Sequence, residues 1–472
     1  MEGSTPFAGA AGAHRGLWHE ERARRAAYSL LRERPGASAG NPAGVPAALW
    51  LGPAGFLAIL ALVDTGVAAL TIALLAGSAF LALAGLRLAA AGLAPQYAPR
   101  TPLSVRDLPR ITVIAALHRE AGSVAALVRA LARFDYPADR YEIALAIEAD
   151  DHETLAAAHR AARHALPALR VIAVPAIGPR TKPKALNYAL ALTNGSLVAV
   201  YDAEDEPHPG QLRAAAEAFA ADAGLGCVQA PLGWPLPLGG TSNVFARAAL
   251  ADCGGWDPYN VTEDADLGFR LARYGWRAGL IAPGTLEEAP VTLKAWTAQR
   301  SRWLKGHAIS WAVHMREPGA LRREAGWRGL GALNASLGAN AASALLHGPA
   351  FAVLAALIVL ALANASPPWA VLPALAGYGA AILAARTGAR RAGFRARAAD
   401  LALLPAYWLL QSAAMARALR EIVSAPYFWA KTEHGLTARA RTAPDEPHPH
   451  ACLDGGDRAG VRVLRLAQRQ AG

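Results

Sequence analysis

Three acidic side chains follow an apolar run directly and could bind a divalent cation. Leu197–Tyr201 is typical of a buried strand, and Asp202, Glu204 and Asp205 come next. In open α/β sheets, ligands bind just beyond the carboxyl ends of the strands, so an acidic cluster here lies where a site is expected. Such carboxylates repel one another unless a cation lies between them, and Mg²⁺ or Mn²⁺ carrying substrate phosphates is suitable. A solvated acidic loop is the alternative.

A second acidic pair ends another apolar run. Asp150 and Asp151 follow Tyr141–Ile147, which places them on the same rim of the expected sheet. A carboxylate held there could accept hydrogen bonds from a nucleotide base. The alternative is an Asp-rich turn that caps the helix beginning near Glu153. The residues alone leave both interpretations open.

Two lysines open a helix at Thr181–Asn187 (TKPKALN). Lys182 and Lys184 oppose the helix macrodipole at this end, and a bound phosphate would remove the conflict. A solvated pair of lysines is the alternative. The glycine-rich Pro237–Asn243 follows later, and it could let the backbone approach a sugar or form a plain loop.

The segment Val261–Asp266 (VTEDAD) leads into a further helix. Thr262, Glu263 and Asp264 are what an ordinary helix start contains. Near a metal-bound phosphate, however, one of these carboxylates could take a proton from an attacking hydroxyl.

Gln299, Arg302 and Trp303 have the spacing i, i+3 and i+4, which places them on one face of a helix. An amide, a guanidinium and an indole together suit a carbohydrate or a pyrophosphate. A membrane-surface helix held by Arg and Trp is the alternative.

Strand-like and helix-like stretches alternate over residues 108–306, which predicts an α/β domain with a mostly parallel sheet and helices on both faces. A helical stretch begins at Glu120, and the expected strands are Ile111–Leu117, Tyr141–Ile147, Val171–Val174 and Leu197–Tyr201. Many chemistries use this fold class, so function must be argued from the site.

Long apolar runs flank this domain in a chain of 472 residues that is 54% hydrophobic and 18% charged. A transmembrane hairpin is predicted over 45–91, followed after the domain by interfacial helices over 307–348 and a membrane region over 349–424. That region contains two firm spans and a marginal one, Leu401–Ala416. Four spans are favoured, with six as the rival count.

The net charge of +11 comes largely from arginines beside the apolar runs and in the tail. The positive-inside tendency places them in the cytoplasm, near anionic lipid, and no aromatic-studded basic face favours nucleic-acid binding. The three cysteines lack metal-ligand spacing and indicate a reducing compartment. Residues 1–44 and 437–472 are rich in Ala, Gly, Arg and Pro, which predicts disorder.

The order of these elements between apolar runs resembles family-two glycosyltransferases of the cellulose, hyaluronan and chitin synthase type. The resemblance implies a GT-A type domain that transfers a sugar, with inversion, from a nucleotide-sugar such as a UDP-sugar. Asp202 and Glu204 would then bind Mg²⁺ or Mn²⁺, and Asp264 would be the general base. Residues that would contact donor or acceptor are Glu120, Asp150, Asp151, Lys182, Thr262, Glu263, Gln299, Arg302 and Trp303. The segment 425–436 would gate the site, with Lys431, Thr432 and His434 contacting nucleotide.

The resulting hypothesis is a multi-pass plasma-membrane enzyme whose catalytic domain faces the cytoplasm and extends a polysaccharide. Its partners would be a nucleotide-sugar, a glycan or lipid acceptor and membrane lipids, with no nucleic acid; an accessory secretion subunit is compatible. A non-processive transferase onto a lipid, such as a polyprenyl phosphate, is the first alternative. An inactive nucleotide-sugar-binding membrane subunit is the second, because Gln229–Gly239 is shorter than the corresponding connection in those enzymes.

Overall fold

The sheet at the centre of the molecule has seven strands in the order β3-β2-β1-β4-β7-β6-β8. Strand β7 is antiparallel to both of its neighbours, and the other pairings are parallel. The computed structural model describes residues 7–42, 44, 48–93, 96–163, 169–231, 238–286, 290, 292–364, 367, 371–391 and 395–428. The strands of the sheet are β1 (Ile111–Leu117), β2 (Tyr141–Glu148), β3 (Leu169–Val174), β4 (Leu197–Tyr201), β6 (Leu225–Gln229), β7 (Asn243–Ala246) and β8 (Arg277–Leu280).

The mostly parallel sheet predicted from the apolar runs is confirmed. Strands β1 and β4 have the predicted bounds, and β2 and β3 include the predicted runs. Ile111 of β1 pairs with Tyr141 on one side and with Leu197 on the other, so three parallel strands begin in register. A small separate sheet joins β5 (Glu206–Pro207) to β9 (Thr285–Leu286).

Helices cover both faces of the sheet, each with its own apolar core. One face packs against α4 (Val124–Leu131), α5 (His152–Ala162) and α7 (Gln211–Ala221). The other face packs against α1 (Phe7–Glu33), α6 (Lys182–Leu190), α8 (Arg247–Cys253) and α9 (Glu263–Arg273).

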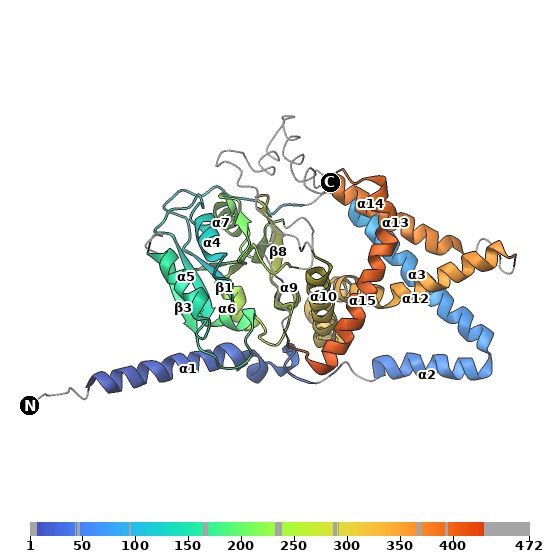
Figure 1. Ribbon diagram of the computed structural model, residues 1–472, viewed down its shortest axis with the longest axis horizontal. Helices are drawn as coiled ribbons and strands as arrows, with labels where there is room; N and C mark the ends of the chain where they lie inside the picture. The colour runs from blue at the N-terminus through green and yellow to red at the C-terminus, as the bar shows by residue number, and fades with distance from the viewer. Residues whose placement is uncertain are drawn as a thin grey trace, which may run out of the picture.

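The prediction of disorder over 1–44 is wrong for the described part of that segment. Helix α1 lies along the sheet domain, followed by the short helix η1 (Pro35–Ala37) (Figure 1). Its alanines Ala23 and Ala27 are fully buried, and Asn187 of α6 donates a hydrogen bond to the carbonyl of Ala26 at 3.2 Å. Small side chains let this Ala-rich helix approach α6 closely, so the composition that indicated disorder serves helix packing.

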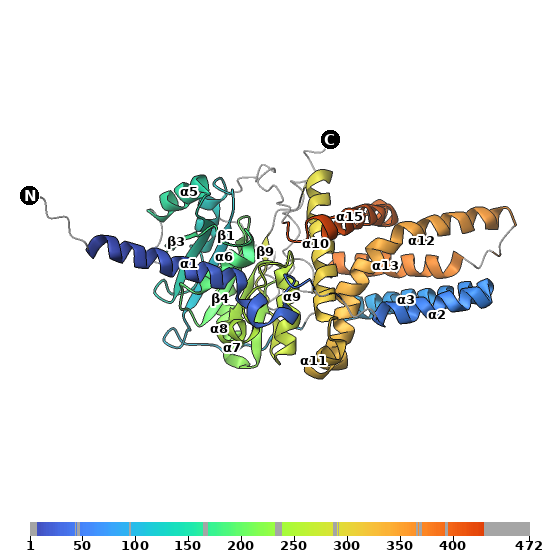
Figure 2. The ribbon, with the colours of Figure 1, turned by 90° about the horizontal axis from the view of Figure 1, so that it is seen from below.

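Four apolar helices extend from the sheet domain on one side (Figures 1 and 2). They are α2 (Ala48–Val63), α3 (Thr65–Gly92), α12 (Ala339–Leu362) and α13 (Leu372–Arg391). Helices α3 and α13 pack closely, because a Cβ on Gly377 would lie 1.8 Å from the ring of Phe80. By length and composition, one helical stretch among the described residues could cross a membrane, Pro318–Leu362. The multi-pass topology stays a prediction.

Helices α10 (Leu293–His314) and α15 (Leu404–Ser424) lie between the sheet domain and the four apolar helices in both views (Figures 1 and 2). They pack on each other and on α12 through Leu304, Ala341, Ala344, Ala414 and Met415. The remaining elements are α11 (Pro318–Leu333), η2 (Asn334–Gly338) and α14 (Ala398–Ala402). Pro405 lies in the first turn of α15, where proline is tolerated, so the marginal apolar run Leu401–Ala416 is divided between α14 and α15 just before this residue.

Candidate active site

Lysine 182 and aspartate 202 meet at the carboxyl rim of the sheet. Asp202 follows β4 directly, and Lys182 is the first residue of α6. The ammonium group of Lys182 donates to the carboxylate of Asp202 and, at 2.6 Å, to the carbonyl of Gly240. Burial lowers the pKa of this ammonium, but the carboxylates of Asp202 and Glu263 outweigh that effect and raise it. Lys182 is therefore a fixed positive charge beside the proposed metal ligand.

Asp264 joins this pair from a different part of the chain. A methyl group on Gly240 would lie 3.6 Å from Nζ of Lys182, 3.7 Å from Oδ2 of Asp264 and 3.9 Å from Oδ2 of Asp202. Three charged groups from α6, α9 and the loop after β4 thus converge on one point of backbone. Any side chain at position 240 would occupy that point, so glycine keeps it open.

Glu263 and Asp264 begin α9 as neighbouring carboxylates, the first buried and the second partly buried. Burial, followed by the charge of Asp264, raises the pKa of Glu263 to about 8. Burial also raises the pKa of Asp264, although Lys182 and the backbone amide of Ala265 act against it. A carboxylate with a raised pKa binds a proton more readily, which suits a general base.

Arg302 supplies a second positive charge to the same rim. Its guanidinium lies within electrostatic range of four acidic residues: Asp202, Glu204, Glu263 and Asp264. Burial lowers the pKa of Arg302, and these carboxylates act in the opposite direction. The structure therefore brings together Asp202, Glu204, Glu263, Asp264, Lys182 and Arg302.

The three acids after β4 do not all face the rim. Asp202 and Glu204 are partly exposed, whereas Asp205 is buried. Asp205 accepts hydrogen bonds from the amide of Asp202, at 2.6 Å, and from the hydroxyl of Thr241. Asp205 consequently shapes the turn, and the interpretation of it as a third rim carboxylate is wrong.

Asp150 and Asp151 differ in their surroundings. Asp151 caps α5 by accepting from the amide of Thr154 at 3.3 Å, and it also accepts from the amide of Arg119. Burial raises the pKa of Asp151, but these hydrogen bonds outweigh it and lower the pKa. Asp150 is partly exposed and pairs with Arg180 at 2.6 Å. The capping alternative therefore describes Asp151, and Asp150 is the more accessible carboxylate.

Glu120 lies in the same region, because its amide donates to the hydroxyl of Thr154 at 3.0 Å. Lys184, considered above as a phosphate ligand, is instead fully buried in an ion pair with Glu148 at 2.7 Å. An ammonium held this way does not face a ligand at the start of α6, and that interpretation of Lys184 is wrong.

Thr262 packs against α10, the helix that carries Gln299, Arg302 and Trp303. Thr262 is buried, and a Cβ on Gly306 of α10 would lie 2.3 Å from its hydroxyl. Gln299, Arg302 and Trp303 share one face of α10, as their spacing predicted, and all three are partly exposed. The indole of Trp303 packs against the guanidinium of Arg300 at 4.4 Å. Lys431, Thr432 and His434 lie outside the described residues.

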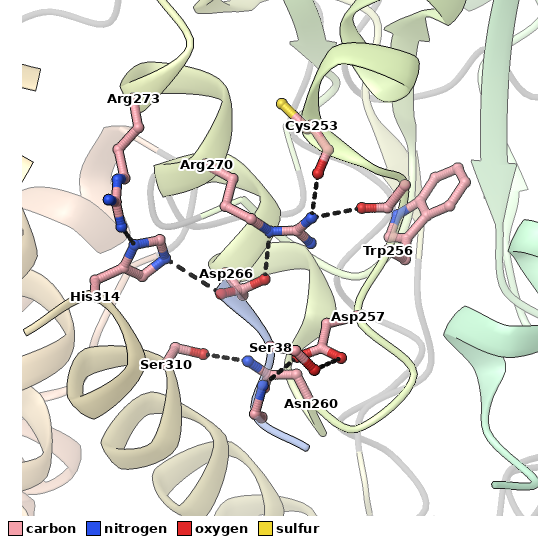
Figure 3. A network of polar contacts seen from close by, with 12 residues as sticks. Ser38, Cys253, Trp256, Asp257, Asn260, Asp266, Arg270, Arg273, Ser310 and His314 are labelled. Carbon is pink, nitrogen blue, oxygen red and sulfur yellow. Dashed lines mark hydrogen bonds and ion pairs between the residues drawn. The ribbon is translucent and has the colours of Figure 1, made fainter. Parts of the chain in front are cut away.

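A buried polar network around Asp266 was not predicted (Figure 3). Asp266 pairs with Arg270 at 2.8 Å and with His314 of α10 at 3.2 Å. Arg270 also donates to the carbonyls of Cys253 and Gly255, at 2.7 and 2.8 Å. The i, i+4 spacing of Asp266 and Arg270 was readable in the sequence. No local signal pointed to His314.

The segment that follows η1 also makes polar contacts in this region. Ser38 donates to Asp257 at 3.0 Å, and the amide of Ala39 donates to the same carboxylate at 2.6 Å (Figure 3). Arg316 donates to the carbonyls of Ser38 and Asn41 at 2.9 and 2.7 Å. Residues far apart in sequence thus hold the start of α9 in place.

The donor set of the rim fits a hard divalent cation. Mg²⁺ commonly binds through one or two carboxylates together with substrate phosphates, and Asp202 and Glu204 supply two. Over the described ranges, no group of three or more His, Cys, Asp or Glu side chains is arranged to hold a metal on protein ligands alone. Phosphate oxygens would therefore complete the coordination.

The mostly parallel sheet with helices on both faces is a GT-A-like α/β domain. A solved structure with this fold is a mannosyltransferase from Pyrobaculum calidifontis in complex with GDP-Man and Mn²⁺. The likeness has a TM-score of 0.50 at 24% identity and covers 75% of this chain and 98% of that chain.

Two family models match the chain. Glycosyltransferase like family 2 matches residues 109–235, and Glycosyl transferase family group 2 matches residues 212–384. The chain therefore carries a glycosyltransferase family 2 domain, the domain of a sugar-transferring enzyme, as the sequence predicted.

Curated relatives include two beta-monoglucosyldiacylglycerol synthases. The protein from Synechocystis sp. is 30% identical over 248 residues, which are 45% of this chain and 51% of that protein. The protein from Nostoc sp. is 29% identical over 234 residues, 42% of this chain and 49% of that protein. The chain spans about half the length of these relatives.

Proposed function

We propose that this protein is a membrane-bound inverting hexosyltransferase that moves a sugar from a nucleoside diphosphate sugar to a lipid hydroxyl. The convergence of Lys182, Asp202 and Asp264 around Gly240 carries the proposal. It places an ammonium group, a carboxylate that could bind a metal ion and a candidate general base beside Gly240. The names of the relatives, which are synthases of a glucosyl lipid, favour a lipid over a glycan as acceptor.

The donor diphosphate would lie between the positive groups of the rim. Asp202 and Glu204 would hold Mg²⁺ or Mn²⁺ on it, and that cation would neutralise charge building on the leaving diphosphate. Lys182 and Arg302 would add fixed positive charge on either side. Lys182 is bound to Asp202 here, and donor binding would give its ammonium a phosphate oxygen as a further partner.

The nucleoside would lie further along the rim, toward the loops after β1 and β2. Asp150 is the accessible acid there, with Asp151 and Glu120 fixing the two loops to each other. Gln299 and Trp303, on the face of α10 that carries Arg302, would contact the sugar or the acceptor. Thr262 would act by positioning the start of α9, since it is buried against Gly306. Lys431, Thr432 and His434 stay proposals as nucleotide contacts.

Asp264 would be the general base. Its carboxylate would accept the proton of the acceptor hydroxyl while the hydroxyl oxygen bonds to the anomeric carbon and the bond to the diphosphate breaks. The raised pKa of Asp264 suits proton acceptance near neutral pH. Attack opposite the leaving group inverts the anomeric centre.

Membrane attachment would come from the four extended helices. Large apolar side chains on them are exposed, including Leu62 (88%), Val63 (79%) and Leu362 (80%). Such surfaces are costly in water and favourable in lipid. The catalytic domain would face the cytoplasm, where nucleotide-sugars are supplied.

A processive polysaccharide synthase is the second candidate. The shared helix face of Gln299, Arg302 and Trp303 favours it, because an indole beside an amide could hold the end of a glycan. An accessory secretion subunit would be expected only in that case. An inactive donor-binding subunit is the third candidate, and the short Gln229–Gly239 connection motivates it.

Product analysis separates these candidates. Purified protein in lipid vesicles is incubated with radiolabelled UDP-glucose or GDP-mannose, with Mn²⁺ or Mg²⁺, and with diacylglycerol. We expect a metal-dependent single-sugar lipid. A high-molecular-weight glycan would overturn the lipid acceptor, and donor binding without any product, even as hydrolysis, would support the inactive subunit.

A further inference from the structure

Arg300 lies on α10 between two indole rings. Its guanidinium is 4.4 Å from the ring centroid of Trp303 and 5.9 Å from that of Trp296. Tyr407 of α15 packs edge-on against Trp296, with ring centroids 5.4 Å apart. Trp303 is one of the candidate active-site residues, so Arg300 adjoins that site through this indole.

The side chain of Arg300 is partly buried, and the structure gives it no anionic partner among the described residues. Its Nε atom is inaccessible to solvent and has no hydrogen-bond partner, and among the described residues no carboxylate lies within 4.0 Å of it. The neighbouring His307 is neutral at physiological pH, because burial, followed by the charge of Arg300, lowers its pKa to about 4. Aromatic faces offset part of the cost of burying a cation, but they do not replace an anion.

Other buried cations in the described chain do have such partners. Lys184 is paired with Glu148 at 2.7 Å, Arg270 with Asp266 at 2.8 Å, and Lys305 of α10 with Glu421 at 3.1 Å. Lys305 lies little more than one helical turn from Arg300. The fold thus supplies a carboxylate to each of these three fully buried cations, whereas the partly buried Arg300 has none within 4.0 Å among the described residues.

The position of Arg300 indicates where its anion would come from. Trp296 packs on the cluster that joins α10 to α12 and α15, and these helices lie between the sheet domain and the apolar bundle (Figures 1 and 2). In a membrane-bound molecule this seam meets the head groups of the cytoplasmic leaflet, which carries anionic lipids. Arg, Trp and Tyr are the side chains that favour that level of a bilayer.

We propose that Arg300, with Trp296, Trp303 and Tyr407, binds the phosphate of an anionic phospholipid head group at this seam. The proposal rests on the membrane attachment put forward above, but it does not depend on the transfer reaction. A phosphodiester would give the partly buried guanidinium charge-assisted hydrogen bonds, and the rings would hold the guanidinium plane toward the phosphate. Anionic lipid would then fix α10, and with it Arg302, in position.

Lipid binding is measured by native mass spectrometry on the delipidated full-length protein, without sugar donor. Dioleoylphosphatidylglycerol and dioleoylphosphatidylcholine are each titrated against wild type, Arg300→Gln and Arg322→Gln. Arg322 is a matched control, because it lies over Trp327 at 5.1 Å on α11 and is exposed. We expect Arg300→Gln to weaken phosphatidylglycerol binding about tenfold, equivalent to about 1.4 kcal/mol, and Arg322→Gln to change it little.

Thermal unfolding gives a second readout that needs no activity. Without anionic lipid, Arg300→Gln should unfold at the same temperature as wild type or higher, since it removes a partly buried charge that has no carboxylate partner. Added phosphatidylglycerol should stabilise wild type and leave Arg300→Gln unchanged. If Arg300→Gln does not fold, Arg300→Lys replaces it, with a smaller shift expected because lysine lacks the planar fork.

Two outcomes would overturn the proposal. Equal phosphatidylglycerol binding and equal stabilisation in wild type and Arg300→Gln would show that the guanidinium does not hold the head group. Displacement of the lipid by soluble glycerophosphate at equal concentration would show a free-phosphate site instead. Sugar transfer that fails for other reasons would leave both readouts intact.

Discussion

Asp264 and Asp266 lie two residues apart on α9 and show how differently one helix can use the same side chain. Asp266 is enclosed by Arg270 and His314, at 2.8 and 3.2 Å. Burial raises its pKa, but those partners outweigh the effect and lower it. Asp264 faces the rim with Glu263 beside it, and burial raises its pKa. One carboxylate is satisfied by the fold, whereas the other is left for a substrate.

This contrast separates positioning from chemistry. A carboxylate with two fixed partners cannot accept a proton readily, so Asp266 holds α9 in place. A carboxylate with a raised pKa among cations can do so, and Asp264 is that group. The predictions below either break this division of roles or sharpen it, and they run from the largest expected effect on sugar transfer to the smallest.

Replacing the candidate base should have the largest effect. Asp264→Asn keeps the shape of the side chain but cannot take a proton, so we expect transfer to fall about 10²–10⁴-fold, the usual contribution of a general base. Donor binding, measured by calorimetry, should change little. Asp139→Asn is the control, because that side chain is 82% exposed. Unchanged transfer in Asp264→Asn would remove this residue from its role.

Replacing the candidate metal ligand should come next. Asp202→Asn removes a negative charge from the cation and from Lys182 together, so transfer should fall about 10²-fold and the apparent Mn²⁺ affinity should fall by about 10- to 100-fold. A metal titration of the initial rate measures both. Excess Mn²⁺ should restore part of the activity of Asp202→Asn and none of that of Asp264→Asn. Equal behaviour of the two variants would contradict their separate roles.

The strands that carry Asp202 and Asp150 could be predicted because their residues are largely apolar. Tyr141–Glu148 and Leu197–Tyr201 are buried along their whole length and pair in parallel with β1, and such strands appear as largely continuous apolar runs. The acidic turns that follow them were visible for the same reason. Strands β7 and β8 were not predicted, since each has four residues and β8 begins with the exposed Arg277.

The partners of each acid could not be predicted from the sequence. Nothing near Asp205 or Asp151 distinguishes a side chain that turns inward from one that faces the rim; Thr241 and Arg119 decide this in the folded chain. The docking of α1 was also missed, because its contacts with α6 involve Ala26 and other small residues that resemble those of a flexible segment. Composition describes a segment but not what it packs against.

Replacing the structural acid should reduce stability rather than chemistry. Asp266→Asn leaves Arg270 buried without its charge partner, and breaking a buried ion pair costs about 3–5 kcal/mol. Chemical denaturation of the detergent-solubilised protein measures this loss. Transfer per folded molecule should stay within a few-fold of wild type, with an unchanged donor KM. A large loss of kcat at full stability would mean that Asp266 takes part in the reaction.

The smallest expected effect is on how the free energy of unfolding depends on pH, and it compares Glu263 with Asp266. The pKa of Glu263 is raised to about 8, so the folded state holds this proton more tightly than the unfolded state does. Its stabilising contribution is therefore full below the unfolded pKa of about 4.3 and is lost as pH rises toward about 8. Asp266 has the opposite sign: its lowered pKa stabilises the fold above the unfolded value, and that contribution is lost as pH falls.

Chemical denaturation of the metal-free protein across this pH range should show that the free energy of unfolding declines toward high pH (the alkaline decline) and toward low pH (the acid limb). Glu263→Gln should flatten the alkaline decline and leave the acid limb unchanged, whereas Asp266→Asn should flatten the acid limb. Added Mn²⁺ and donor should reduce the alkaline decline of wild type, because positive charge at the rim favours the ionised form of Glu263. If Glu263→Gln altered the acid limb instead, the two sides of α9 would not be electrostatically distinct.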